Sequence, residues 1–420
     1  MKHPVMSVQF GLATGSTTRV STRLEFPRKE TMRTLTLVST SQIGQPNRAT
    51  IRLLEKRDEY PRTVLYEDEL HSDILDEEGP LSAPGFWRIL YPLLPAPVAQ
   101  VLEGYRLRRR YDAIITWSPR LSLLFALLLK VRRSQTPHIA LMSWISASKK
   151  AILLKYCHSH ISRLVFWSSV QRRFAIERLG IPPSKTSLVH RRADHLFWRP
   201  MNVPSDTICS AGQEMRDFVT LVEALRETDI PCHIATGTFG KKTFDTVKAL
   251  QRLEALPPTI TIGKMAYVDL RNLYARSRFI VVPLLDSDTD NGAGVIEAAM
   301  AMGKAVICSK TGGQVDIILP GKTGLLVPPG DPDALRKAIL YLWNNPSVAE
   351  QMGREGRSEL ECHHTLDRFV ADVKQIVLEV IGEPSSAIPE ALPKEEGQLQ
   401  KASRARAKFQ QATRQENLAD

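Results

Sequence analysis

Short apolar runs rich in β-branched residues alternate along the chain with stretches whose apolar residues recur every three or four positions. The runs are bounded by Gly, Pro or polar residues, which predicts strands buried on both faces of parallel sheets. Helical periodicity falls between these runs. We expect strands at 35–40, 111–118, 138–144, 163–169, 232–237, 259–264, 279–285, 305–310 and 324–329, and helices at 122–133, 217–228, 269–277, 294–302 and 333–345.

This alternation predicts an α/β protein built from βαβ units in doubly wound sheets. A proline-containing break at 199–206 divides the alternation into comparable halves, and 420 residues suit two domains. We therefore predict two Rossmann-like domains, over 32–203 and 204–365. The ends of the chain, 1–31 and 383–420, lack apolar periodicity and are expected to be disordered.

The first 31 residues are rich in Ser, Thr and Arg and carry no acidic residue before Glu25. Such a composition is also typical of transit peptides, so that interpretation stays open beside a dispensable extension. Met32 directly precedes the first predicted strand, so the functional start is either Met1 or Met32.

The segment 79–110 does not fit the alternation, because it combines prolines and large apolar residues with a basic end. Two interpretations remain open. The segment is either an insertion packed on the first domain, or an element that gathers the acceptor or touches a membrane surface.

Composition excludes several classes of protein. The chain is 43% hydrophobic and 24% charged, as in soluble globular proteins, and its longest apolar stretch, Leu121–Leu129, is too short to span a membrane. Five scattered cysteines without C-x-x-C spacing predict neither a disulfide framework nor a zinc knuckle, and they favour a reducing cytoplasmic compartment. The run Cys362–His364 is not expected to bind metal, because adjacent helical side chains point in different directions.

The formal charge of +11 is concentrated in one region. Residues 101–175 contain 14 Lys and Arg against two acidic residues, so the excess belongs to the first domain. This favours an anionic membrane surface or an anionic acceptor as a partner, and hence a cytoplasmic protein or one peripheral to the membrane. No recognised nucleic-acid module is present, so no nucleic-acid partner is expected.

The most informative local motif is the turn Asn291-Gly292-Ala293-Gly294, between a predicted buried strand and a predicted helix. Glycines let backbone N–H groups approach an anion, and a helix N-terminus adds the positive end of its dipole. The turn therefore predicts a pyrophosphate site.

Four longer segments carry a resemblance to a known family. IEAAMAMGKAVICS (296–309), PGKTGLLVPPGDPDAL (320–335), SAGQEMRDFVTLVEAL (210–225) and the linking stretch 177–200 resemble family 4-like retaining glycosyltransferases, or glycosyl transferases group 1. The resemblance implies the GT-B architecture, in which the two Rossmann-like domains face a central cleft. It also implies that 204–365 binds a nucleotide-sugar, that 32–203 is the acceptor side, and that a helix at 366–382 returns to the first domain.

The resemblance assigns roles to particular positions. Donor binding falls on Gly212, Arg216, Gly263, Gly292, Gly294 and Val295, with Arg216 as the cation for the diphosphate and Gly263 near the base. The catalytic acids fall on Asp290 and Glu297, although Glu297 stands one place early relative to Gly303. Gln213 replaces a second cation. In the first domain the expected Gly-rich turn keeps only Gly44, and the strand 138–144 lacks a terminal His, which leaves His158, His160, His190 and His195 as candidates.

The resemblance implies transfer of a sugar from a nucleoside-diphosphate sugar to a glycan, lipid or small-molecule acceptor, with retention and without a metal or cofactor. Two alternatives remain open. One is a nucleotide-sugar epimerase of the same fold, and the other is a catalytically impaired GT-B scaffold that docks on membranes or acidic partners.

Overall fold

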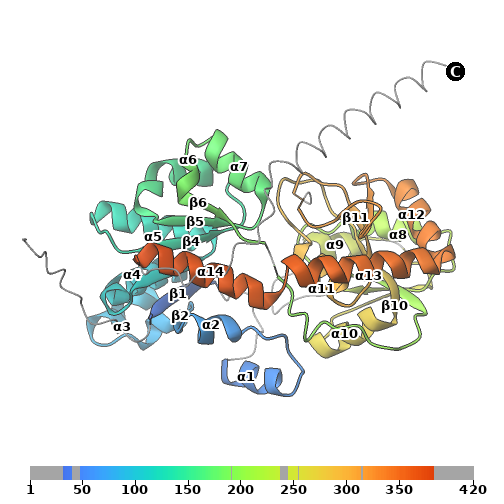
Figure 1. Ribbon diagram of the computed structural model, residues 1–420, viewed down its shortest axis with the longest axis horizontal. Helices are drawn as coiled ribbons and strands as arrows, with labels where there is room; N and C mark the ends of the chain where they lie inside the picture. The colour runs from blue at the N-terminus through green and yellow to red at the C-terminus, as the bar shows by residue number, and fades with distance from the viewer. Residues whose placement is uncertain are drawn as a thin grey trace, which may run out of the picture. The chain divides into compact units, whose positions relative to one another are not determined.

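A computed structural model describes residues 32–39, 48–190, 192–236, 245–253, 255–313 and 316–382. The two extensions that we expect to be disordered, 1–31 and 383–420, and the turn at Gly44 lie outside these residues. The described part contains two parallel sheets of six strands each, flanked by helices (Figure 1). The predicted α/β class with two Rossmann-like domains is therefore confirmed.

The first sheet has the strand order β2-β1-β3-β4-β5-β6. All neighbouring strands are parallel, and β1 lies in the interior, where Thr34 pairs with Ser72 on one side and with Ala113 on the other. The strands are β1 (Thr34–Val38), β2 (Ser72–Leu75), β3 (Ala113–Trp117), β4 (His138–Met142), β5 (Arg163–Phe166) and β6 (Thr186–Leu188).

Helices cover both faces of the first sheet. Right-handed crossovers between parallel strands place α4 to α7 on one face and α1 and α2 on the other, where α14 also contacts α2 and β3 (Figure 1). The helices are α1 (Arg48–Lys56), α2 (Leu65–Glu69), α3 (Phe86–Leu90), α4 (Ala96–Leu107), α5 (Pro119–Val131), α6 (Ser148–Cys157), α7 (Ser169–Glu177) and α14 (Leu366–Ile381).

The segment 79–110 turns out to be part of the alternation, which corrects our expectation that it interrupts the pattern. Its main helix, α4, is the crossover from β2 to β3 and packs against β1 and α5. The amide of Gln100 donates hydrogen bonds of 2.7 Å to the carbonyls of both Val38 and Leu75, which ties α4 to β1 and β2. The prediction failed because β2 is only four residues long, SDIL, and has no apolar run.

The second sheet has the order β12-β11-β10-β7-β8-β9. It begins after the predicted break, and β7 lies between β8 and β10. Its strands are β7 (Thr207–Ala211), β8 (Cys232–Ala235), β9 (Ile260–Gly263), β10 (Ser277–Val282), β11 (Ala305–Ser309) and β12 (Gly324–Val327); its helices are α8 (Phe218–Leu225), α9 (Asp245–Gln251), α10 (Tyr267–Arg276), α11 (Ala293–Ala301), α12 (Pro332–Asn344) and α13 (Pro346–His363).

The chain returns from the second half to the first at the end of α13. Ala193 and Thr365 form a parallel bridge there, and α14 follows directly. The guanidinium of Arg357 on α13 donates hydrogen bonds to the carbonyls of Trp198 and Ala301, which anchors the linker against α11. α14 then packs on the first sheet, with the Phe369 ring 5.9 Å from the ring of Trp117.

The cysteines of this chain are mostly core residues. Four of the five cysteines are buried, and all five are free thiols. Among the described residues, no helix combines the length and apolar character needed to cross a membrane.

Candidate functional site

The strand order of the second sheet defines where a ligand crevice lies. From β7 the chain moves outward through β8 and β9, and then returns to the other side of β7 through β10, β11 and β12. The order reverses between β7 and β10. In open α/β sheets, ligands bind at such a switch point, beyond the carboxyl ends of the strands.

Arg216 lies at the carboxyl end of β7, directly at this switch point. Its Nε donates to the carbonyl of Ala211 and its Nη1 to the carbonyl of Glu214, both at 2.9 Å. The residue also forms an antiparallel bridge with Leu284, which follows β10. Burial lowers the pKa of the Arg216 guanidinium, but an arginine keeps its charge in proteins. A fixed cation therefore lies between the two strand ends.

Gly212 is the partner that this arginine requires. Its φ is 107°, a left-handed conformation that side chains rarely adopt. A Cβ at Gly212 would lie 2.4 Å from Nη2 of Arg216, so the guanidinium packs directly on this backbone. The predicted pair Gly212 and Arg216 is thus brought together by the fold.

The glycine turn after β10 opens α11 towards the switch point. Gly292 is the residue before the helix, with a φ of 90°, and a Cβ there would lie 2.9 Å from Cγ1 of Val282. Gly294 differs, because it is exposed, and apart from its chain neighbours and its own helix backbone no described atom lies within 4 Å of the place its Cβ would occupy. Val295, also a predicted donor residue, is half-buried against the adjacent core. The first turn of α11 therefore offers open space beside its amides, as an anion site requires.

Asp290 lies where the loop after β10 meets the first domain. The residue is 6% exposed, and its loop packs tightly on Gly313, where a Cβ would lie 1.8 Å from the carbonyl oxygen of Thr289. The side chain of Gln171, from α7 of the first domain, donates a 2.9 Å hydrogen bond to the carbonyl of Asp288. Asp290 is thus held at the boundary between the two domains.

Glu297 lies one turn further along α11 and is buried. Its carboxylate is 1% exposed, and its Oε1 is 3.8 Å from Nδ1 of His364, which is 4% exposed. The His364 ring in turn contacts the ring of His190, with centroids 5.0 Å apart. The structure places Glu297 at the junction where α13 ends and the chain crosses back.

Gly263 is the last residue of β9, which lies two strands away from β7 in the same sheet. Its carbonyl accepts a 3.0 Å hydrogen bond from the amide of Thr236, and the ring of His233 lies 3.6 Å from the position of its Cβ. Thr236 is 3% exposed, and among the described residues its hydroxyl has no hydrogen-bond partner. Sequence reasoning missed Thr236, and a lone threonine after a strand gives no signal that would have found it.

Two contacts between the domains were also missed. The amide and hydroxyl of Ser169, at the start of α7, donate to the carboxylate of Asp316 at 2.7 and 2.6 Å. Asp58 accepts hydrogen bonds from Arg199 in the linker and Arg271 on α10, and those guanidinium groups lower the pKa of its carboxyl. The partners lie 147, 141 and 213 residues apart, too far for local sequence patterns to connect them.

The histidines that were left as acceptor-side candidates occupy separate places. His195 has its Nδ1 3.7 Å from Asp367 at the start of α14, and His190 contacts His364. His158 and His160 precede β5, at the amino edge of the first sheet, away from the carboxyl ends of its strands. Within the described ranges, no three His, Cys, Asp or Glu side chains gather as a metal site.

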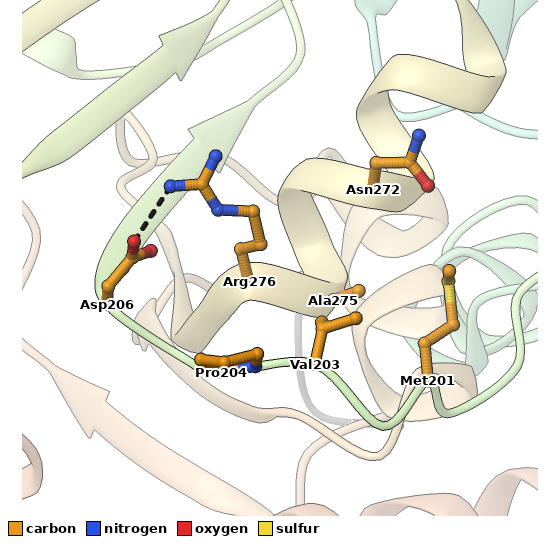
Figure 2. Close-up of a pocket in the computed structure, with 7 residues that line it drawn as sticks. All are labelled: Met201, Val203, Pro204, Asp206, Asn272, Ala275 and Arg276. Atoms are coloured by element: carbon orange, nitrogen blue, oxygen red, sulfur yellow. Dashed lines mark hydrogen bonds and ion pairs between the residues drawn. The ribbon is translucent and has the colours of Figure 1, made fainter.

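A cavity of about 370 Å³ lies elsewhere, beside the linker (Figure 2). Met201, Val203 and Pro204 form one wall and α10 the other, and the ion pair between Asp206 and Arg276 (2.8 Å) borders it. Asp206 precedes β7, so this cavity lies at the amino edge of the second sheet. It contains none of the predicted site residues.

Comparison with known proteins agrees with this geometry. The family model described as glycosyl transferases group 1 matches residues 211–345. A D-rhamnosyltransferase of Pseudomonas aeruginosa is 34% identical over 140 residues, which are 33% of this chain and 35% of that protein. An uncharacterised glycosyltransferase of Methanocaldococcus jannaschii is 26% identical over 164 residues, 38% of this chain and 44% of that protein. The chain thus spans less than half the length of the curated relatives it matches.

Solved structures match over a larger share. Sucrose-phosphate synthase of Thermosynechococcus elongatus superposes with a TM-score of 0.65 at 18% identity, covering 83% of this chain and 99% of the other. Anabaena HepE in complex with UDP-glucose gives a TM-score of 0.62 at 15% identity, covering 84% of this chain and 99% of the other. At these identities the likeness concerns the fold. The chain has the GT-B fold, and its residues 211–345 match the family model of glycosyl transferases group 1.

Proposed function

We propose that the chain is a glycosyltransferase that moves a sugar from a nucleoside-diphosphate sugar to an acceptor hydroxyl, with retention of the anomeric configuration and without a metal. One observation carries the proposal. The switch point of the second sheet brings a buried cation, Arg216 on Gly212, to the same crevice as the open first turn of α11. The glycosyl transferases group 1 match covers this region, and HepE, of the same fold, has been solved with UDP-glucose.

The crevice suits a diphosphate leaving group. When the bond from the anomeric carbon to the phosphate oxygen breaks, negative charge develops on the diphosphate. The Arg216 guanidinium and the amides at Gly292 and Gly294 stabilise that charge, because they are oriented before the reaction begins. The acceptor oxygen forms the new bond on the same face of the sugar, and its proton passes to the departing phosphate oxygen.

The two acids have different roles in this proposal. Asp290 lies at the domain boundary, where an acceptor from the first domain would meet the sugar, so we assign it to the sugar side of the crevice. Glu297 is buried beside His364, and we propose it as the second acid of the site, placed where the chain crosses back into α14. The acceptor, whether a glycan, a lipid or a small molecule, enters from the first domain.

The proposal is tested by incubating the full chain with UDP-, GDP- and ADP-sugars and an acceptor panel, with EDTA present. We expect a glycosylated product whose anomeric coupling in proton NMR matches the donor. Asp290→Asn is expected to lower transfer by about 100-fold, as for a group acting at the reacting centre. The exposed neighbour Asp286, replaced by Asn, serves as the matched control and should retain full activity.

The same experiment separates the rivals. Interconversion of donor sugars without any acceptor would identify an epimerase and overturn the proposal. A chain that binds none of the nucleotides and turns over no donor would be a scaffold. This alternative stays open because Gln213 stands where the resemblance leads us to expect a second cation. Product with inverted configuration would contradict retention alone.

A further inference from the structure

An apolar face stands outward on the segment that leads into α4. Four large side chains there are strongly exposed: Leu81 (52%), Phe86 (68%), Ile89 (70%) and Leu93 (77%). Phe86, Ile89 and Leu93 are spaced by three and four residues, so they share one side of the helical run formed by α3 and the 3₁₀ turn at Tyr91–Leu93. Contiguous exposed apolar residues of this size mark an interaction surface.

The segment is firmly held, so this exposure is not a sign of a loose loop. Its inner side buries Tyr91 (1% exposed), Ala83 and Ala99 in a small cluster with Trp87, whose ring stacks on Tyr91 at 5.3 Å. The Tyr91 hydroxyl donates to Glu103 at 3.0 Å. One side of the segment is thus packed against the first domain, and the other side is exposed to solvent.

From Gly79 onward, the charged residues around this face are mostly cationic. Arg88 is the only charged residue between 79 and 102. In the region 101–175, with 14 Lys and Arg, the two acids are already engaged: Glu103 pairs with Arg106 at 2.6 Å, and Asp112 accepts the amide of Arg33 at 2.9 Å. Three acids lie directly upstream: Asp76 accepts the amides of Glu78 and Gly79, Glu77 accepts a 2.8 Å hydrogen bond from the Ser39 hydroxyl, and Glu78 is exposed.

The cations and the apolar residues belong to one layer of helices. α4, α5 and α6 pack side by side on the same face of the first sheet, and α3 adjoins them at the edge (Figure 1). Further exposed residues on this layer continue the mixture. We call this the α3–α6 face; its exposed apolar and aromatic residues are Leu81, Phe86, Ile89, Leu93, Val131, Ile152 and Tyr156, and its exposed cations are Arg88, Arg109, Arg110, Arg120, Arg132, Arg133, Lys149 and Lys155.

We propose that the α3–α6 face docks on an anionic lipid bilayer, with Phe86, Ile89 and Leu93 entering the headgroup–acyl boundary. Apolar insertion beside clustered cations is the combination that binds anionic membranes from one side. The cationic surroundings disfavour a second copy of this chain as the occupant, because two such faces would repel. This inference does not depend on sugar transfer, since lipid binding is measured without any donor.

Vesicle flotation tests the proposal. The full chain is mixed either with vesicles of phosphatidylcholine alone or with phosphatidylcholine vesicles that contain about 30 mol% phosphatidylglycerol. This is roughly the anionic content at which polybasic surfaces bind. We expect the chain to bind the anionic vesicles at least about tenfold more tightly. We also expect 0.5 M NaCl to weaken this binding, because the Debye screening length falls there to about 4 Å. Equal binding to both kinds of vesicle, or none, would overturn the proposal.

Two sets of variants separate the apolar and charged contributions. The triple variant Phe86→Ser, Ile89→Ser and Leu93→Ser, and the quadruple variant Arg109→Gln, Arg110→Gln, Arg132→Gln and Arg133→Gln, should each lower anionic-vesicle binding by about tenfold or more. The control, Leu340→Ser with Tyr341→Ser, removes exposed apolar residues from α12 of the second domain and should bind normally. Unchanged binding of the triple variant contradicts docking through this face. A chain that sediments as a dimer, and that the triple variant converts to monomer, would assign the face to self-association instead.

Discussion

His138 illustrates how a single buried group couples stability to pH. The side chain is fully buried on β4, with its Nε2 2.9 Å from the Thr116 hydroxyl and its ring against Phe125. Burial lowers the pKa of this imidazole from 6.5 to about 3. Between these values the unfolded chain binds a proton that the folded chain does not. The free energy of unfolding therefore falls as the pH drops from about 6.5 towards 3.

We predict that His138→Gln flattens this acid destabilisation. One proton changes the free energy of unfolding by at most about 1.4 kcal/mol per pH unit. The pH dependence of the free energy of unfolding should be smaller in the variant by up to this amount. Urea unfolding at pH 7, 6, 5 and 4 measures it, with the exposed His363→Gln as the control. Parallel curves for wild type and His138→Gln would show that the imidazole is not the titrating group.

The site residues differ in how well the sequence alone predicts them. Gly292 and Gly294 follow from the turn itself, because glycine between a strand and a helix has a physical meaning. Arg216 follows only from the family resemblance, and its packing on Gly212 could not be read from the sequence. Glu297 shows the limit most clearly. Its position on a helix was evident, but its neighbour His364 is 67 residues away in the chain, so its burial at the junction was not predictable.

Two glycines of α13 face α11 at different distances. α13 packs on the end of α11 through Gly353, where a Cβ would lie 2.0 Å from the backbone oxygen of Gly303. Three residues further along the same helix, a Cβ at Gly356 would lie 3.3 Å from the flexible side chain of Met300. The two glycines therefore face obstacles of different stiffness.

We predict that Gly353→Ala lowers the free energy of unfolding by about 1–3 kcal/mol, because a rigid backbone cannot yield. Gly356→Ala should change it by less than about 1 kcal/mol, because Met300 can move and alanine favours the helix. Chemical denaturation of both variants measures the difference. Equal effects, or a larger loss at Gly356, would contradict the packing of α13 on α11.

Most strands were predictable because they are apolar runs bounded by turn residues. The misses share a physical cause. β2 reads SDIL, β6 has three residues and β7 reads TICSA, so none displays a long apolar run. Their place is fixed by pairing with β1, β5 and β10, and not by a pattern within the strands themselves. Missing β2 made 79–110 look like an insertion, although α4 is a regular crossover helix.

Across the whole molecule, the two domains meet through contacts that join distant parts of the chain. Ser169 with Asp316, and Gln171 with Asp288, connect α7 to the loops that follow β11 and β10. These loops border the crevice at the switch point. The first domain thus contacts the loops at the switch point, one of which carries Asp290, as the proposed transfer between substrates held by different domains requires.

In our proposal, the open first turn of α11 holds the diphosphate of a nucleotide. Because Gly294 faces open space, Gly294→Glu places a carboxylate there without a steric clash, and Gly294→Gln adds the same bulk without charge. Negative charge beside the bound diphosphate should repel it and cancel the attraction of the helix dipole.

The direct measurement is calorimetric titration of UDP, GDP and ADP into the wild-type chain and both variants. We predict one site for at least one of these nucleotides, weakened by about tenfold or more in Gly294→Glu relative to Gly294→Gln. Equal affinities for the two variants, or no nucleotide binding by the wild type, would contradict the claim.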